Sequence, residues 1–286
     1  MERILIYGTG TMATGIAQVA ATAGKTVFIV PPWRDMSLAQ GSRDKIRAQL
    51  DRAVQKGTQT PENAALVMER IVTVPDMAEL AGQVDLLLEA VIEDLGAKKE
   101  VFTLAKGLPF DPGTVFATNS SALSITELAN CTGRPGMFAG IHFFNPAPVM
   151  GLVEIVKGAA TEPGTVEKAK AFAESLGKTA IVVSEAPGFV VNRILVPMIN
   201  EAVFALMEGV ASAEDIDRGM KLGANHPIGP LALADLIGLD VCLSVMETLY
   251  REFGDPKYRP CPLLCKYVRA GFLGRKAGRG FFAYGQ

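Results

Sequence analysis

The amino-acid sequence predicts an α/β chain in which a doubly wound, parallel sheet comes first and an all-α domain follows. Short apolar runs alternate with helix-like stretches as far as residue 183, the pattern of a parallel sheet with crossover helices. A glycine-rich turn follows the first apolar run, at residues 8–15. After a break at residues 186–189, the chain has the spacing of apolar-faced helices. We therefore expect two domains, residues 1–186 and residues 187–286.

Residues 3–30 have the order strand, glycine turn, helix, strand. In that context a glycine motif indicates a Rossmann-type, dinucleotide-binding turn. Gly8 permits the tight turn, Gly10 lets the backbone approach a pyrophosphate, and Ala13 is the small residue at the third position. The amides at the positive end of the helix would bind the pyrophosphate. The expected cofactor contacts of this turn are Gly8, Gly10, Thr11, Met12 and Ala13.

The end of the second strand leaves the choice between NAD and NADP open. An acidic residue usually binds the adenosine ribose there, but this sequence has Pro31, which offers neither charge nor acceptor. Arg34 is close enough in sequence to meet a 2′-phosphate, and Trp33 or Arg34 could stack on adenine. Asp35 could serve as a displaced acid. An ordinary exposed proline-rich loop is the alternative interpretation.

Six further strands and several helices are expected before the break, and two of these strands carry His142 and Glu154. Helices are predicted over residues 37–56, 61–70, 97–106 and 165–176, and strands over 71–74, 85–91, 115–119 and 179–183. After the break, helices are predicted over residues 190–207, 213–222 and 231–253. These last helices are apolar over more surface than one small domain covers, so we expect a homodimer joined through them.

His142 and Glu154 are the strongest candidates for chemistry. Each lies in or beside an apolar, strand-like run, and burying a lone charged residue there is costly unless it is paired. A carboxylate on one imidazole nitrogen would fix the tautomer and direct the other nitrogen to acid/base work. A buried structural histidine beside a strand-edge glutamate is the alternative.

Composition excludes several classes of function. The chain has 286 residues, 49% of them hydrophobic, and a net charge of −2 with both signs interspersed, so no nucleic-acid or membrane-surface partner is indicated. No apolar run is long enough to span a bilayer, and a strand beginning at residue 3 leaves no room for a signal peptide. The four cysteines lack metal-ligand spacing. We expect a cytoplasmic protein with reduced thiols and without a metal.

Seven motifs together give the chain a specific resemblance over essentially its whole length. They are Gly8-Thr-Gly-Thr-Met12, Glu89-Ala-Val-Ile-Glu93, Thr118-Asn-Ser-Ser121, His142-Phe-Phe-Asn-Pro146, Pro187-Gly-Phe-Val-Val-Asn-Arg193, Gly223-Ala-Asn-His-Pro227 and Gly274-Arg-Lys-Ala-Gly278. With these motifs the chain resembles the short-chain (3S)-3-hydroxyacyl-CoA dehydrogenases, close to the bacterial 3-hydroxybutyryl-CoA enzymes. The resemblance implies interconversion of 3-hydroxyacyl-CoA and 3-oxoacyl-CoA with NAD(P).

The resemblance also implies roles for matching residues. His142 would be the general acid/base, Glu154 would orient and support it, and Ser121 and Asn192 would bind the substrate oxygens. Lys56 would contact CoA. The residues implied to line the nicotinamide half of the cofactor are Ala90, Glu93, Lys98, Asn119, Ser121, Asn145 and Lys276. Lys56 and Lys98 could instead be solvated helix residues, and Asn192 could pin a turn.

Two other functions stay open at this point. A β-hydroxyacid dehydrogenase of the 6-phosphogluconate type would need a catalytic lysine, and residues 190–220 contain none. A non-catalytic, crystallin-like protein on the same fold is disfavoured by the intact set of Ser121, His142, Glu154 and Asn192. Departures from the family pattern at Pro31, Ala13 and Gly151 leave the proton-transfer pair untouched.

Overall fold

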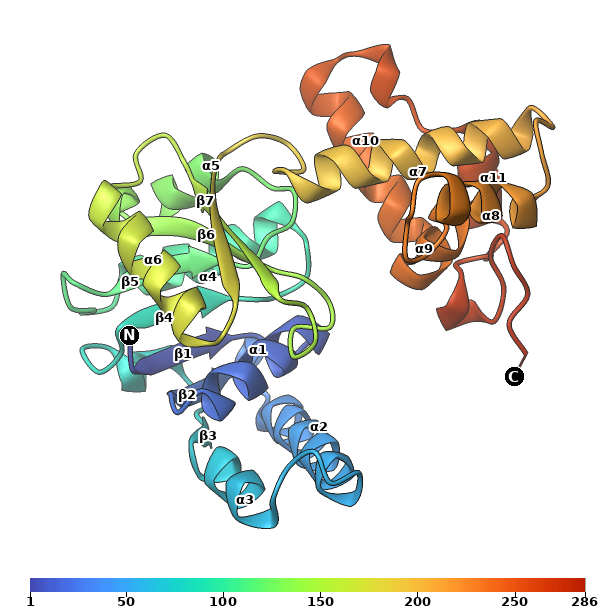
Figure 1. Cartoon of the computed structure of the whole chain (residues 1–286). Helices are drawn as coiled ribbons and strands as arrows, with labels where there is room; N and C mark the ends of the chain where they lie inside the picture. Colours follow the sequence, from blue (N-terminus) through green and yellow to red (C-terminus); the bar gives the residue numbers. More distant parts are fainter. Residues whose placement is uncertain (286) are drawn as a thin grey trace. The chain divides into compact units, whose positions relative to one another are not determined.

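The computed structural model describes residues 1–285, and contacts along the chain divide it into two compact units. The first unit is Met1–Glu185, and the second is Ala186–Gln286 (Figure 1). The first is built on a sheet and the second on helices, so the predicted Rossmann-type sheet followed by an all-α domain is confirmed. No helix in the described part of the chain has the length and apolarity needed to cross a membrane.

The first unit contains an eight-stranded sheet in the order β3-β2-β1-β4-β5-β6-β7-β8. Its strands are β1 (Arg3–Tyr7), β2 (Thr26–Val30), β3 (Ile71–Thr73), β4 (Leu86–Glu89), β5 (Val115–Thr118), β6 (Phe138–Phe143), β7 (Leu152–Lys157) and β8 (Thr179–Ser184). The strand order reverses between β1 and β4, which is the switch point where doubly wound sheets bind ligands.

One strand pairing differs from the expected parallel arrangement. β7 runs antiparallel to β6, and all other neighbouring strands are parallel. A short connection joins β6 to β7 without a helix, and such a connection can only return the chain antiparallel. The exception matters, because it places Glu154 directly opposite His142 in the ladder.

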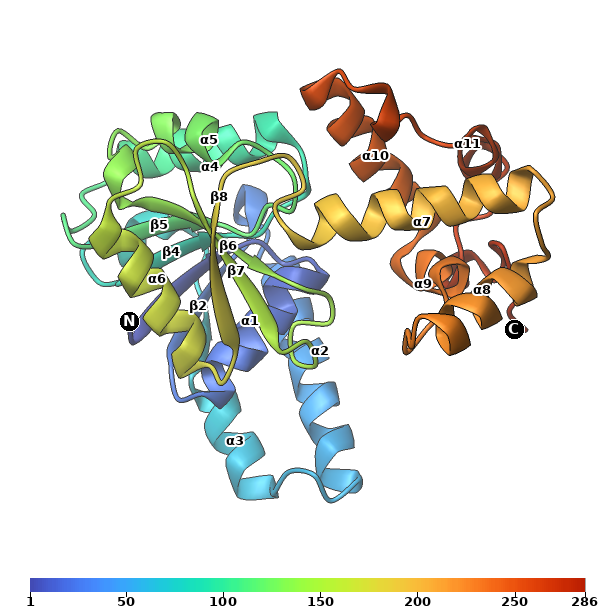
Figure 2. The same cartoon turned by 45° about the horizontal axis from the view of Figure 1, so that its top comes forward.

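Helices cover both faces of the sheet (Figure 2). Ile4 and Ile6 of β1 pack with Ile16 of α1 and Phe172 of α6 in one continuous core, while α4 and α5 lie on the opposite face. The helices of this unit are α1 (Thr11–Thr22), α2 (Met36–Gln55), α3 (Pro61–Glu69), α4 (Leu95–Lys106), α5 (Ile125–Cys131) and α6 (Pro163–Ser175), with 3₁₀ turns η1 (Pro32–Arg34), η2 (Met77–Leu80) and η3 (Pro135–Met137).

The second unit packs five helices around its own core. They are α7 (Val191–Met207), α8 (Ala213–Gly223), α9 (Pro230–Ile237), α10 (Leu239–Phe253) and α11 (Pro262–Arg269), with 3₁₀ turns η4 (Pro256–Tyr258) and η5 (Arg275–Ala277). Val203, Leu231, Met246 and Leu264 come from four of these helices and pack in a single cluster.

The long helix expected over residues 231–253 was wrong, because Gly238 divides it into α9 and α10. Gly238 has φ +108°, outside the range of a helix and unfavourable for any residue with a Cβ. Helices α5 and α11 were not predicted from the sequence.

The last described residues are fastened to α9 by one buried carboxylate. Asp235 accepts hydrogen bonds from the amides of Phe281 and Phe282, both at 2.9 Å, and from the Tyr284 hydroxyl at 3.0 Å. A charge this deeply buried is tolerated because each oxygen has a donor.

Candidate active site

The glycine turn lies where β1 and β4 end side by side. Gly8 has φ +140°, and a Cβ there would lie 2.4 Å from the carbonyl oxygen of Ala90. Gly10 begins α1 and faces open space, with no atom within 4 Å of an added Cβ. The two glycines thus serve different needs: Gly8 lets two strands converge, and Gly10 keeps the helix start accessible to a phosphate group.

A cavity of about 860 Å³ opens beside this turn. Its walls are residues 7–12, the loop at 30–34, the loop at 75–78, residues 90–92 and one face of α4. The volume is ample for part of a dinucleotide. Of the expected cofactor residues, Gly8, Gly10, Thr11, Met12, Arg34 and Ala90 line this cavity.

The loop after β2 borders the cavity, and its side chains differ in exposure and in partners. Trp33 is 86% exposed, and Arg34 forms an ion pair with Asp76. Asp35 caps α2, accepting from the Ser37 amide at 3.0 Å and the Ser37 hydroxyl at 2.5 Å, and these bonds lower the pKa of its carboxyl. Asp35 is therefore committed to the helix and is not positioned as a substitute ribose ligand.

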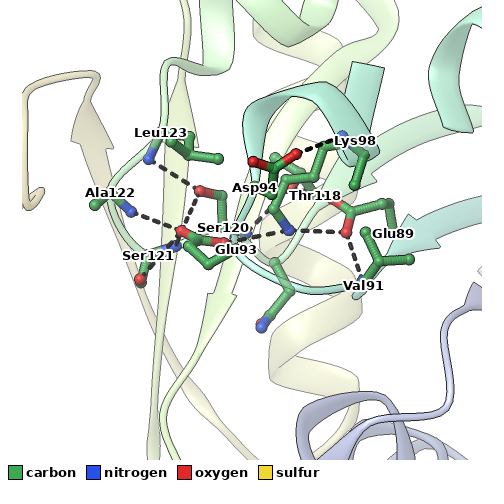
Figure 3. Close-up of polar contacts among 12 residues, drawn as sticks. Glu89, Val91, Glu93, Asp94, Lys98, Thr118, Ser120, Ser121, Ala122 and Leu123 are labelled. Carbon is green, nitrogen blue, oxygen red and sulfur yellow. Dashed lines mark hydrogen bonds and ion pairs between the residues drawn. The ribbon is translucent and has the colours of Figure 1, made fainter. Parts of the chain in front are cut away.

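Lys98 is buried between two carboxylates, so the alternative of a solvated helix residue is wrong (Figure 3). Its ammonium lies 2.8 Å from Glu89 and 3.3 Å from Glu93. Glu89 is fully buried at the end of β4 and also accepts from the Thr118 hydroxyl and the Val91 amide, both at 2.6 Å. The Lys98 ammonium neutralises this charge, and the hydroxyl and amide donors satisfy other acceptor sites of the carboxylate, which offsets the cost of burying it.

Glu93 holds the turn that carries Ser121 (Figure 3). Its carboxylate accepts from the Ser121 amide at 2.7 Å, the Ser121 hydroxyl at 3.2 Å and the Ser120 hydroxyl at 2.6 Å. Burial alone would raise the pKa of Glu93, but the Lys98 ammonium and these hydrogen bonds outweigh it and lower the pKa. Glu93 is thus an anion at neutral pH that orients the Ser121 hydroxyl.

His142 and Glu154 form the expected pair. The imidazole Nδ1 lies 2.7 Å from Glu154 Oε2, across the antiparallel ladder of β6 and β7. His142 is 5% exposed and Glu154 is fully buried, and Phe144 lies against the imidazole at 4.5 Å between ring centroids. A carboxylate held this way fixes the orientation and the tautomer of the imidazole.

The other predicted residues lie in several places. Asn119 directly follows β5 and accepts from the Phe143 amide at 2.9 Å, while Asn145 is exposed just beyond β6. Lys56 is exposed at the end of α2. Asn192 and Lys276 belong to the second unit, where the Lys276 ammonium pairs with Asp240 at 2.6 Å.

Four polar residues that line the cavity were not predicted from the sequence: Tyr7, Thr9, Asp76 and Glu100. Asp76 could have been found, because it follows the strand predicted at residues 71–74, and ligand contacts gather where parallel strands end. Glu100 lies within a helix, and no local pattern distinguishes it from a solvated residue.

A glycine turn at the switch point of a doubly wound sheet and a buried His–Glu pair in the same unit define the class of dinucleotide-dependent oxidoreductases. Residues 3–186 match the family model described as 3-hydroxyacyl-CoA dehydrogenase, NAD binding domain, and residues 188–284 match its C-terminal domain. The chain belongs to the 3-hydroxyacyl-CoA dehydrogenase family. It is an oxidoreductase with an NAD-binding domain, as the motifs predicted.

Individual relatives cover almost the full length. A Bacillus subtilis protein named probable 3-hydroxybutyryl-CoA dehydrogenase is 49% identical over 99% of this chain and 98% of its own. The 3-hydroxybutyryl-CoA dehydrogenase of Clostridioides difficile is 47% identical over 99% of both chains. The crystal structure of (S)-3-hydroxybutyryl-CoA dehydrogenase from Ralstonia eutropha is 45% identical, with a TM-score of 0.95 and full coverage of both chains.

Proposed function

We propose that this protein interconverts (3S)-3-hydroxybutyryl-CoA and acetoacetyl-CoA with a nicotinamide dinucleotide. The observation that carries the proposal is the buried pair of His142 and Glu154, 2.7 Å apart, in a chain 45–49% identical to proteins named for that activity. The open cradle at Gly10 and the adjoining cavity fit the cofactor. When bound, the dinucleotide supplies the hydride acceptor or donor.

His142 acts as the general acid/base in this proposal. Because Nδ1 is engaged by Glu154, exchange of the 3-hydroxyl proton falls to Nε2. Glu154 stabilises the imidazolium that forms when the proton arrives, and its burial strengthens that interaction. In the direction of reduction the same imidazolium returns the proton to the substrate oxygen.

Substrate contacts are assigned to Ser121, Asn192 and Lys56. The Ser121 hydroxyl, oriented by Glu93, would bind a substrate oxygen. Asn192 stays a predicted contact of the substrate oxygens. Lys56 is an exposed cation that suits the phosphates of CoA. Lys98, Asn119, Asn145 and Lys276 stay predicted residues of the nicotinamide half of the site. Lys98 would act through Glu93, since its ammonium lies between the two carboxylates.

Absorbance at 340 nm with acetoacetyl-CoA and reduced cofactor tests the proposal. Oxidation of NADH that depends on acetoacetyl-CoA is expected. Turnover of a 3-hydroxy acid without CoA would instead favour the 6-phosphogluconate-type alternative. Cofactor binding without turnover of any hydroxyacyl-CoA would favour the crystallin-like one.

We expect NADH to be the better cofactor and NADPH to give measurable turnover. Pro31 removes the usual acidic discriminator against a 2′-phosphate, and Arg34 stands in the same loop. The kcat/KM with NADH should exceed that with NADPH by no more than about a hundredfold, the range commonly spanned by one coupled interaction. Strict NADH dependence would contradict this prediction.

We also propose a cytoplasmic homodimer. All four cysteines are unpaired, as is usual in a reducing compartment. Large apolar side chains of the helical unit are exposed, among them Ile194, Leu222 and Val241 at 66%, 80% and 45%. Their exposure supports association through these helices.

A further inference from the structure

The loops that follow β2 and β3 leave the sheet at the same edge. The two strands are parallel neighbours, with Val27 opposite Ile71 and Ile29 opposite Thr73. The pairing continues past β3, since the Val74 amide donates to the Ile29 carbonyl at 3.0 Å. Asp76 therefore lies beside the loop that begins at Pro31. Pro31 occupies the position where dinucleotide sites of this type usually have their ribose-binding acidic residue.

The Asp76 carboxylate is tied to the backbone of its own turn, whereas Arg34 reaches it through an exposed side chain. One Asp76 oxygen accepts from the Ala78 amide at 3.0 Å and caps η2, while the other pairs with Arg34. The Asp76 side chain is 24% exposed and that of Arg34 is 74% exposed. A long, exposed arginine can move away from a fixed carboxylate, so Asp76 is the constant charge at this wall.

The described wall of the cavity carries more negative than positive charge. Its charged residues are one cation, Arg34, and two carboxylates, Asp76 and Glu100. Burial raises the pKa of Tyr7, and the nearby Asp76 carboxylate raises it further, against the effect of Arg34. The negative field of Asp76 therefore extends to Tyr7 at the end of β1, next to the glycine turn.

We propose that Asp76 determines cofactor specificity in place of the acid that is absent at Pro31. Asp76 has two effects in this proposal. Its carboxylate repels a 2′-phosphate, and it neutralises Arg34, the cation in the described wall of the cavity. Pro31 and Arg34, which follow β2, are expected to permit NADP binding. Asp76, which follows β3, limits that binding. This inference rests on the proposed use of a nicotinamide dinucleotide and adds the residue that selects between its two forms.

Asp76→Asn tests the proposal, because asparagine keeps the helix cap and loses the charge. Dissociation constants for NADH and NADPH are measured by fluorescence titration of the full-length protein without substrate. The ratio of the NADPH to the NADH dissociation constant should fall roughly two- to fivefold, the range of one partly exposed charge interaction. Glu79→Gln is the matched control, since Glu79 lies on η2, is exposed and does not line the cavity.

Arg34→Ala in both backgrounds separates the two effects of Asp76. The substitution should weaken NADPH binding more in the Asp76→Asn protein than in the native one, because only there is the arginine released. An unchanged ratio in Asp76→Asn, or an equal change in Glu79→Gln, would overturn the proposal. The proposed reaction is tested separately, by measuring turnover of acetoacetyl-CoA. The cofactor titrations contain no substrate and do not depend on that result.

Discussion

The His142–Glu154 pair makes the sharpest prediction at the scale of single residues. His142→Ala should lower kcat by about a hundred- to ten-thousandfold, the usual contribution of a general acid/base. Glu154→Gln should lower it by roughly ten- to a hundredfold, because a charge-assisted hydrogen bond to the imidazolium is lost. Stopped-flow turnover of acetoacetyl-CoA measures both. NADH affinity should stay native in each variant, and near-native rates would show that the proton moves elsewhere.

Lys98 and Lys99 are adjacent in sequence but differ in surroundings. Lys98→Met should lower the free energy of unfolding by about 3–5 kcal/mol, because it leaves Glu89 buried without its ammonium partner. Lys99→Met should change it little, because the ion pair of Lys99 with Glu127 at 2.5 Å is exposed. Urea denaturation followed by circular dichroism compares them. An equal loss of unfolding free energy in the two variants would mean that the buried ion pair of Lys98 and Glu89 does not stabilise the protein.

The burial of Lys98 could not have been predicted from sequence. Its two partners come from the end of β4 and from the loop that follows, and Thr118 of β5 binds the same Glu89 carboxylate. Only the sheet order brings these segments together. His142 and Glu154 were recognisable because each interrupts or borders an apolar run, a local signal that survives without the fold.

At the scale of elements, replacing glycine with alanine should have opposite effects on stability at two positions. Gly238→Ala should destabilise the protein by about 1–3 kcal/mol, because φ is +108° and the new Cβ would lie 2.9 Å from Asp240. Gly219→Ala should stabilise it by about 0.5–1 kcal/mol, since Gly219 is inside α8 with nothing within 4 Å. Thermal unfolding monitored by circular dichroism measures both shifts. The same sign at both positions would contradict the argument.

Gly238 also shows which elements can be predicted from the sequence and which cannot. Strands β1, β2 and β4 and the glycine turn follow from local pattern, because apolar runs bounded by turn residues determine them. The division of residues 231–253 into two helices does not, since an isolated glycine is tolerated within many helices. The direction of β7 follows from its short, helix-free connection to β6 and not from the sequence of the strand itself.

At the scale of the whole molecule, the prediction is a homodimer. Multi-angle light scattering at micromolar concentration should give twice the chain mass of 30.4 kDa. Val241→Asp on α10 should shift the population toward monomer if this exposed apolar side chain becomes buried on association. Gln40→Asp on α2, an exposed position in the other unit, is the control for added charge. A strictly monomeric native protein would refute the prediction.

The direct opposition of His142 and Glu154 in an antiparallel ladder has a consequence for how this protein tolerates insertions and deletions. Backbone hydrogen bonds between β6 and β7 set the register of the pair, while the connection at residues 144–151 only closes the hairpin. Residues could be added to that connection with the two side chains still facing each other. Deleting one residue within β6 or β7 would turn His142 or Glu154, respectively, to the opposite face of the sheet. The carboxylate would then no longer contact the imidazole.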